Sequence, residues 1–107
     1  MPGVQLPLSA TNYCQNIYWV YGLVLTDGIS KDAKKVMNLL AENNIGSRPF
    51  FYPLHKQPVL KKLGYYSKEN FPVAEELSYS GFYVPSGLAL TDNQINRVSE
   101  VLYKVLK

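Results

Sequence analysis

A nearly unbroken apolar run from residue 16 to residue 26 constrains the fold of this chain most. The run reads Asn16-Ile17-Tyr18-Trp19-Val20-Tyr21-Gly22-Leu23-Val24-Leu25-Thr26. Its aromatic and β-branched residues favour a β-strand. Because apolar residues point to both faces, we expect a strand that is covered on both sides. A turn that ends the strand is predicted at Asp27-Gly28. A strand covered on both sides implies a sheet with other layers packed on it.

A first helix is predicted after this strand, from about Lys31 to Asn43. Ser30 is the expected N-cap, because its hydroxyl can accept a hydrogen bond from the first helical turn. The apolar residues recur at helical spacing and are expected to form one buried stripe. These are Ala33, Val36, Met37 and Leu40.

A second helix is predicted from Asp92 to about Val105. Thr91 is its expected N-cap, and Gln94 stands three residues later, which is the pattern of a capping box. Leu90 and Ile95 are placed for a hydrophobic staple across that cap. The stripe expected to be buried consists of Ile95, Val98, Leu102 and Val105.

Shorter elements are predicted between the two helices. Ile45 to Tyr52 is typical of a short strand, and Pro49 restricts it to an edge or a bulge. A helical turn is expected at 59–63, and a helix is expected to begin at Pro72 and end at Gly81. Residues 82–84 are typical of another strand. The predicted fold class is therefore α/β, a small sheet of about three strands packed with helices.

Size and charge restrict the possible functions. The chain has 107 residues, which suits one domain, and its net charge is only +3. The lysines are spread along the chain, whereas a nucleic-acid surface usually shows a denser basic stripe. No run reaches the roughly 20 apolar residues that span a bilayer, and no signal peptide is recognisable at residues 1–7. Cys14 is the only cysteine, which favours a reducing cytoplasm.

Few residues suggest chemistry of their own. Cys14 and His55 could form a nucleophile pair, but no third orienting group is suggested. No cluster of metal ligands and no glycine-rich phosphate loop is present in the sequence. Glu75 and Glu76 are adjacent and are interpreted as part of a solvated helix face. The residues by themselves therefore indicate no metal site and no phosphate-binding loop in this chain.

The segment from Arg48 to His55 is unusual. It reads Arg48-Pro49-Phe50-Phe51-Tyr52-Pro53-Leu54-His55, so two prolines stiffen a guanidinium, three aromatic rings and an imidazole. Arginine suits phosphate or carboxylate recognition, and tyrosine and histidine have polar tips on flat apolar bodies. The segment could be the wall of a sugar-phosphate or nucleotide pocket. It could equally be a stiff loop that packs its aromatic rings into the core.

Six segments resemble, in order and spacing, the C-terminal part of the DegT-type sugar aminotransferases. They are Pro2–Pro7, Tyr18–Tyr21, Asn44–Pro58, Phe71–Leu77, Val84–Gly87 and Leu90–Ile95. The resemblance implies the small C-terminal domain of a fold-type-I aminotransferase, with residues 1–15 leading in from a preceding large domain and residues 16–107 forming the small domain. The Arg-Pro-Phe-Phe order at residues 48–51 looks like the perosamine-synthase branch, which aminates a keto sugar on a GDP carrier.

The resemblance also implies what the chain binds and what it lacks. The family is dimeric and uses pyridoxal phosphate, bound by a lysine of the large domain. The small domain adds residues to the nucleotide-sugar pocket, which here would be Arg48, Phe51, Tyr52 and His55. No lysine of this chain lies in a segment like the family's cofactor-binding motif, so the resemblance implies no catalytic and no cofactor-binding residue in this chain. We therefore expect a domain that serves amino-sugar or surface-polysaccharide biosynthesis and is inactive by itself, with no nucleic-acid or membrane partner.

Two other functions remain open from the sequence. The chain could be a free-standing module that binds nucleotide sugars or regulates a full-length aminotransferase. It could also be a small basic nucleic-acid binder, favoured only by its charge and its tyrosines. If the chain is instead the small domain of an aminotransferase, the face that meets the large domain should be exposed. The aromatic residues expected there are Tyr13, Tyr18, Phe50 and Tyr65.

Overall fold

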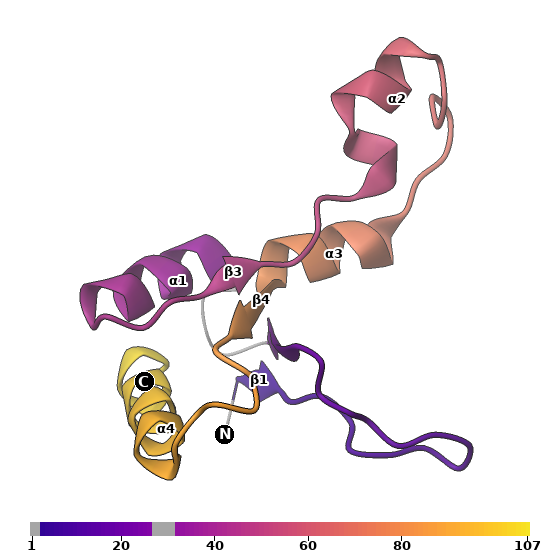
Figure 1. The fold of residues 1–107 in the computed structure, drawn as a ribbon. Coiled ribbons are helices and arrows are strands. Elements are labelled where there is room, and N and C mark those ends of the chain that lie inside the picture. The colour runs from indigo at the N-terminus through magenta and orange to yellow at the C-terminus, as the bar shows by residue number, and fades with distance from the viewer. Residues whose placement is uncertain (1–2, 27–31) are drawn as a thin grey trace.

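The computed structural model describes residues 3–26 and 32–107, which form one antiparallel sheet packed with helices (Figure 1). The sheet has four strands in the order β1-β2-β4-β3. The strands are β1 (Val4–Gln5), β2 (Tyr21–Leu25), β3 (Arg48–Pro49) and β4 (Gly81–Val84). The helices are α1 (Ala33–Glu42), η1 (Leu54–Lys56, a 3₁₀ turn), α2 (Pro58–Lys62), α3 (Pro72–Ser80) and α4 (Asp92–Val105). The α/β class is confirmed, with four strands rather than three.

The extra strand is β1, in a region that the sequence predicted to have little structure of its own. Val4 pairs with Leu25 and Gln5 with Val24. Pro2 and Pro7 flank the strand, and they led us to expect only an extended segment. A strand of two residues has no periodicity to detect, so only its pairing with β2 defines it.

The strand predicted at residues 16–26 is confirmed only in its second half, because β2 begins at Tyr21. A turn occupies the start of the run, where the Asn16 Oδ1 accepts a hydrogen bond from the Tyr18 backbone N–H at 2.7 Å. Such a turn competes with strand pairing. Tyr18 then takes a positive φ of 49°, which an extended strand does not allow. Ile17 and Trp19 are consequently exposed.

The two faces of the sheet are covered differently. Helices α1 and α4 cover one face, which carries Leu23 and Leu25 of β2 and Phe82 and Val84 of β4. All four of these residues are buried. On the opposite face, the ring of Phe50 lies over glycines of β2 and β4, Gly22 and Gly81. The prediction that β2 is covered on both faces is therefore confirmed for this half of the run.

Helix α1 confirms its predicted stripe, since Ala33, Val36 and Leu40 are buried. Its predicted cap is wrong: Asp32 is the N-cap, and its carboxylate accepts from the Lys34 backbone N–H at 3.0 Å. Ser30 and the turn predicted at Asp27-Gly28 lie outside the described residues. Aspartate and serine are comparably good N-caps, so the local sequence could not decide between them.

Helix α4 confirms its predicted bounds and its capping box. The Thr91 side chain accepts from the Gln94 backbone N–H at 3.3 Å, and the Gln94 side chain accepts from the Thr91 backbone N–H at 2.9 Å. The predicted stripe is correct at Leu102, but Ile95 is 51% exposed. The first turn of α4 lies beside an open apolar hollow, so Ile95 has no layer above it.

Candidate functional site

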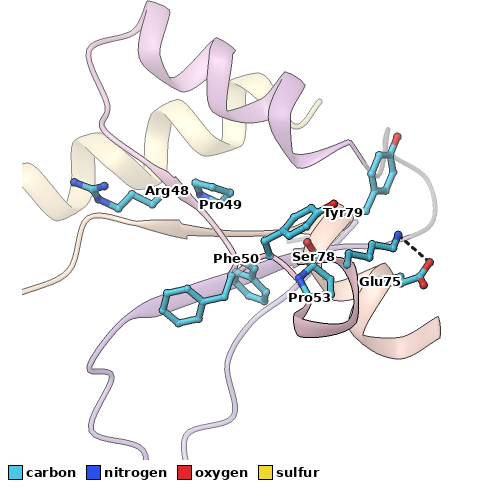
Figure 2. A pocket seen from close by; sticks show the side chains of 10 residues that line it. Arg48, Pro49, Phe50, Pro53, Glu75, Ser78 and Tyr79 are labelled. Atoms are coloured by element: carbon cyan, nitrogen blue, oxygen red, sulfur yellow. Dashed lines mark ion pairs between the residues drawn. The ribbon is translucent and has the colours of Figure 1, made fainter. Parts of the chain in front are cut away.

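The segment from Arg48 to Pro53 lines an open hollow of about 660 Å³ (Figure 2). It supplies one wall, and helix α3 supplies the other. The lining residues are Arg48, Pro49, Phe50, Phe51, Tyr52, Pro53, Lys56, Glu75, Ser78 and Tyr79. In Figure 2, Arg48 lies at one end of this group and Glu75 at the other. We call this hollow the wall pocket.

Strand pairing positions the first wall. Arg48 pairs with Tyr83 and Pro49 with Phe82, which makes β3 the edge strand that Pro49 predicted. The Phe50 backbone N–H continues this pairing by donating to the Gly81 carbonyl at 3.3 Å. Beyond this point the chain leaves the sheet, so Phe51 and Tyr52 are exposed toward the pocket.

Phe50 anchors the wall to the sheet. Its ring stacks on Tyr83, with 4.8 Å between the ring centroids and 29° between the ring planes. A Cβ placed on Gly81 would lie 2.3 Å from the Phe50 ring, so only glycine leaves room for it. Phe50 is half-buried, so the prediction that it belongs to an exposed aromatic patch is wrong, although part of its ring still lines the pocket. Of the two interpretations of the segment, Phe50 packs as structure, while Phe51 and Tyr52 remain accessible.

Three of the four predicted site residues come together in the wall pocket, namely Arg48, Phe51 and Tyr52. His55 does not line this pocket. It lines an adjacent hollow of about 410 Å³, together with Tyr65 and Tyr66. The role of all four residues in substrate binding stays a prediction.

His55 and Lys56 both contact Glu75. The Nε2 of His55 lies 2.9 Å from Glu75 Oε1, and the Nζ of Lys56 lies 3.1 Å from Glu75 Oε2. The hydrogen bond from His55, and then that from Lys56, lowers the pKa of the Glu75 carboxyl below its ordinary value. Glu75 is therefore a charged residue at physiological pH, bonded through both oxygens.

Glu75 is not among the site residues predicted from the sequence, because a pair of adjacent glutamates on a helix is usually a solvated face. Its partners stand about twenty positions earlier in the chain, so no local spacing indicates the contact. Ser78 and Tyr79 were missed as well. One signal was available: Pro72 begins the helix, and Glu75, Ser78 and Tyr79 follow at the spacing that shares one helix face.

A third hollow, of about 700 Å³, is mostly apolar and lies on the other side of β2 and β4. It is lined by Ile17, Tyr18, Trp19, Tyr21, Val84, Pro85, Ser86, Gly87, Leu88, Leu90, Ile95, Val98, Ser99 and Leu102. Ile17 is 87% exposed and Trp19 is 77% exposed. We call this hollow the apolar groove. It offers few polar groups that could orient a small polar ligand.

Cys14 and His55, which the sequence left open as a nucleophile pair, have separate partners. Cys14 is exposed and its Sγ lies 3.2 Å from the Thr11 hydroxyl, whereas His55 is bonded to Glu75. Within residues 3–26 and 32–107, no group of three or more metal-ligating side chains is close enough to hold a metal. None of the described helices has the length and the apolar character needed to cross a membrane.

The residues of the wall pocket do not fit pyridoxal phosphate. Lys56 is the lysine that lines the pocket, but its ammonium is ion-paired with Glu75 and 37% of its side chain is exposed. A lysine that bonds covalently to such a cofactor needs a desolvated or cation-rich surrounding that favours its neutral form. The wall pocket supplies neither.

The chain is similar in sequence to a known family of aminotransferases. The model of the DegT/DnrJ/EryC1/StrS aminotransferase family matches residues 2–103. The chain is 33% identical over 81 residues to the GDP-perosamine synthase of Vibrio cholerae, covering 76% of this chain and 22% of that protein. It is 39% identical over 85 residues to Bacillus subtilis EpsN, which is named as a pyridoxal phosphate-dependent aminotransferase, covering 78% of this chain and 21% of that protein.

The fold is also found in solved structures. Spr1654 of Streptococcus pneumoniae, named as a sugar aminotransferase and solved in its PMP form, superposes with a TM-score of 0.84 at 18% identity. The alignment covers 96% of this chain and 26% of Spr1654. The chain thus spans about a fifth to a quarter of the length of the proteins that it matches.

Proposed function

This chain belongs to the DegT/DnrJ/EryC1/StrS aminotransferase family, and we propose that it is the small C-terminal domain of a transaminase that acts on a nucleotide-linked keto sugar. The names of its relatives support this substrate class. They include GDP-perosamine synthases and, at 26% identity over 102 residues, the dTDP-4-amino-4,6-dideoxy-D-glucose transaminase of Escherichia coli. The amino sugar would serve the biosynthesis of a surface polysaccharide.

The wall pocket is the observation that carries this proposal. A guanidinium at one end can form paired hydrogen bonds with a phosphate. The exposed rings of Phe51 and Tyr52 offer flat apolar faces, and Ser78 and Tyr79 add hydroxyl groups on the opposite wall. A nucleotide sugar combines these features, since it carries phosphates, ring faces and hydroxyl groups. In this proposal the pocket is completed by a large domain and by a second subunit of a homodimer.

Amino transfer in this enzyme depends on pyridoxal phosphate held outside the 107 residues. The state of Lys56 supports this division, because its ammonium is bonded to Glu75. The chain alone should therefore not transaminate. Mixed with pyridoxal phosphate, it should show no saturable cofactor absorbance that is abolished by borohydride reduction, and the appearance of such a band would contradict the proposal.

The substrate role of the pocket is tested by kinetics in the transaminase that contains this chain. Arg48→Ala should raise the KM for the nucleotide sugar about tenfold and change kcat little, because a charge-assisted phosphate contact is lost. His55→Ala should also raise this KM. Lys35→Ala, on an exposed face of α1, is the control and should behave like the wild type. Unchanged kinetics in both variants would show that the wall is purely structural.

The alternative function, a free-standing module that binds nucleotide sugars, makes a different prediction. The 107-residue chain would then bind a GDP-linked sugar, with GDP-mannose as the probe, as tightly as the transaminase that contains this chain binds it. Calorimetric titration of the chain measures this directly. Binding that is much weaker, or lost, supports the domain of a transaminase.

A further inference from the structure

The Glu75 carboxylate joins the two walls of the wall pocket. His55 and Lys56 belong to η1, which directly follows the first wall, residues 48–53. Glu75 belongs to α3, and it shares a helix face with Ser78 and Tyr79 of the second wall. Each carboxylate oxygen is bonded to one residue of η1, at 2.9 and 3.1 Å. We call His55, Lys56 and Glu75 the clamp.

The His55 side chain contacts Glu75 and does not line the wall pocket. It is only 10% exposed, and its ring lies 4.9 Å from that of Phe71, measured between centroids. Glu75 is ionised and accepts only, so the Nε2 of His55 must carry the hydrogen in this contact. The Nε2–H of the imidazole therefore donates its hydrogen bond to Glu75.

The proline residues around η1 make the clamp effective. Pro53 precedes the turn and is buried, and Pro58 begins α2 directly after it. Within the turn, the Lys56 N–H donates to the Pro53 carbonyl and the Gln57 N–H to the Leu54 carbonyl, both at 3.0 Å. Because the backbone of this turn has little freedom, a displacement of His55 should also displace Tyr52 and Phe51.

We infer that Glu75 is a positioning residue, which sets the separation of the two walls, and that His55 acts on substrate binding through Glu75 rather than by touching the sugar nucleotide. This inference rests on the proposed function for its kinetic consequence, but not for its structural one. Other titratable groups line the hollow behind the clamp, namely Lys61, Tyr65, Tyr66 and Glu69.

The structural consequence is tested on the 107-residue chain by NMR. His55 is the only histidine, so ¹⁵N-labelled histidine gives one pair of ring signals that needs no assignment. We expect a protected Nε2–H signal in the wild type. It should persist in Glu75→Gln, whose amide oxygen still accepts, and vanish in Glu75→Ala. The control Glu100→Ala, on the exposed face of α4, should leave it unchanged.

Amide hydrogen exchange gives a second readout on the same samples. In Glu75→Ala, exchange at Lys56 and Gln57 should accelerate about threefold, since a partly exposed contact contributes modestly. Exchange in β2 and β4 should not change, which shows that the fold is intact. A protected Nε2–H and unchanged exchange in Glu75→Ala would overturn the inference.

The kinetic consequence separates the clamp from the pocket itself. In the transaminase that contains this chain, His55→Ala and Glu75→Ala should each raise the KM for the nucleotide sugar about fivefold, and the double variant should be no worse than either. Glu75→Gln should restore most of the affinity. An effect of His55→Ala without any effect of Glu75→Ala would mean direct contact, which overturns the clamp and leaves the proposed function intact.

A different pattern would reject the proposed function instead. If Arg48→Ala and both clamp variants leave the KM unchanged, the wall pocket does not bind the substrate. The NMR signals then still decide whether Glu75 holds His55. The two failures are therefore distinguishable.

Discussion

At the scale of single residues, Glu75 shows how a contact between distant residues changes the meaning of a side chain. Its neighbours in the sequence, Ala74 and Glu76, indicate an ordinary helix surface. Its neighbours in space are an imidazole and an ammonium, each within 3.1 Å. With 36% of its side chain exposed, Glu75 keeps contact with water, so its bonds can serve geometry without the cost of a buried charge.

The lowered pKa of Glu75 predicts how stability depends on acidity. The carboxyl binds a proton less readily in the folded chain than in the unfolded chain. Its contribution to stability is therefore present above the ordinary glutamate pKa of 4.5 and is lost as the pH falls through the lower pKa of the folded state. Urea unfolding of the wild type and of Glu75→Gln, compared between pH 7 and pH 3, measures this. The two midpoints should converge on acidification. A constant difference over this range would contradict the prediction.

At the scale of elements, close approach of Phe50 to β4 determines where the pocket wall lies. Helix α3 ends at Ser80, and Gly81 is both its C-cap and the first residue of β4. A side chain at this point would meet the Phe50 ring at 2.3 Å and the Leu77 carbonyl oxygen at 2.5 Å. The φ of Gly81 is −99°, so its backbone does not require glycine and only the space does.

Gly81→Ala should therefore destabilise the chain by about 1–3 kcal/mol, the usual cost of overpacking. It should also displace the Phe50 ring from Tyr83. Thermal unfolding measures the first effect, and aromatic NMR shifts of Tyr83 measure the second. Gly46→Ala is the matched control, because a Cβ there meets nothing within 4 Å. Equal stability of the two variants would show that the sheet yields easily at this point.

At the scale of the whole molecule, the chain is elongated, with extents of 49 × 36 × 27 Å. Figure 1 shows two projections from the sheet: α2 at one end, and the loop that runs from β1 to β2 at another. This loop carries large exposed apolar residues, among them Tyr13 at 84% and Ile17 at 87% exposure. Together with the apolar groove beside Ile17 and Trp19, they form a surface that favours association.

The isolated chain should consequently self-associate as its concentration rises. A double variant that combines Ile17→Ser and Trp19→Ser should associate more weakly. The apolar groove loses its most exposed side chains in that double variant. Sedimentation velocity over a concentration series measures the change. Tyr103→Ser, which removes an exposed aromatic ring of α4 that lines none of the three hollows, should associate like the wild type. A wild-type chain that is monomeric throughout would contradict this prediction.

Much of the fold could be predicted from residues that act locally. The capping box at Thr91 and Gln94, the proline at the start of α3 and the apolar stripe of α1 are properties of a few neighbouring positions. Pro49 likewise placed β3 at an edge, because it cannot donate a hydrogen bond to a further strand. The family resemblance also rests on ordered sequence segments, and the family model confirms it.

The remaining features required the tertiary structure, because they depend on which distant segments meet. Val4 and Gln5 are a strand only through their pairing with β2, and Tyr18 leaves the strand because Asn16 bonds to its backbone. The sequence alone pointed to the segment from Arg48 to His55. Only the packing of α3 beside it separated the accessible Phe51 from the structural Phe50 and joined His55 to Glu75, since those contacts form across the fold rather than along the chain.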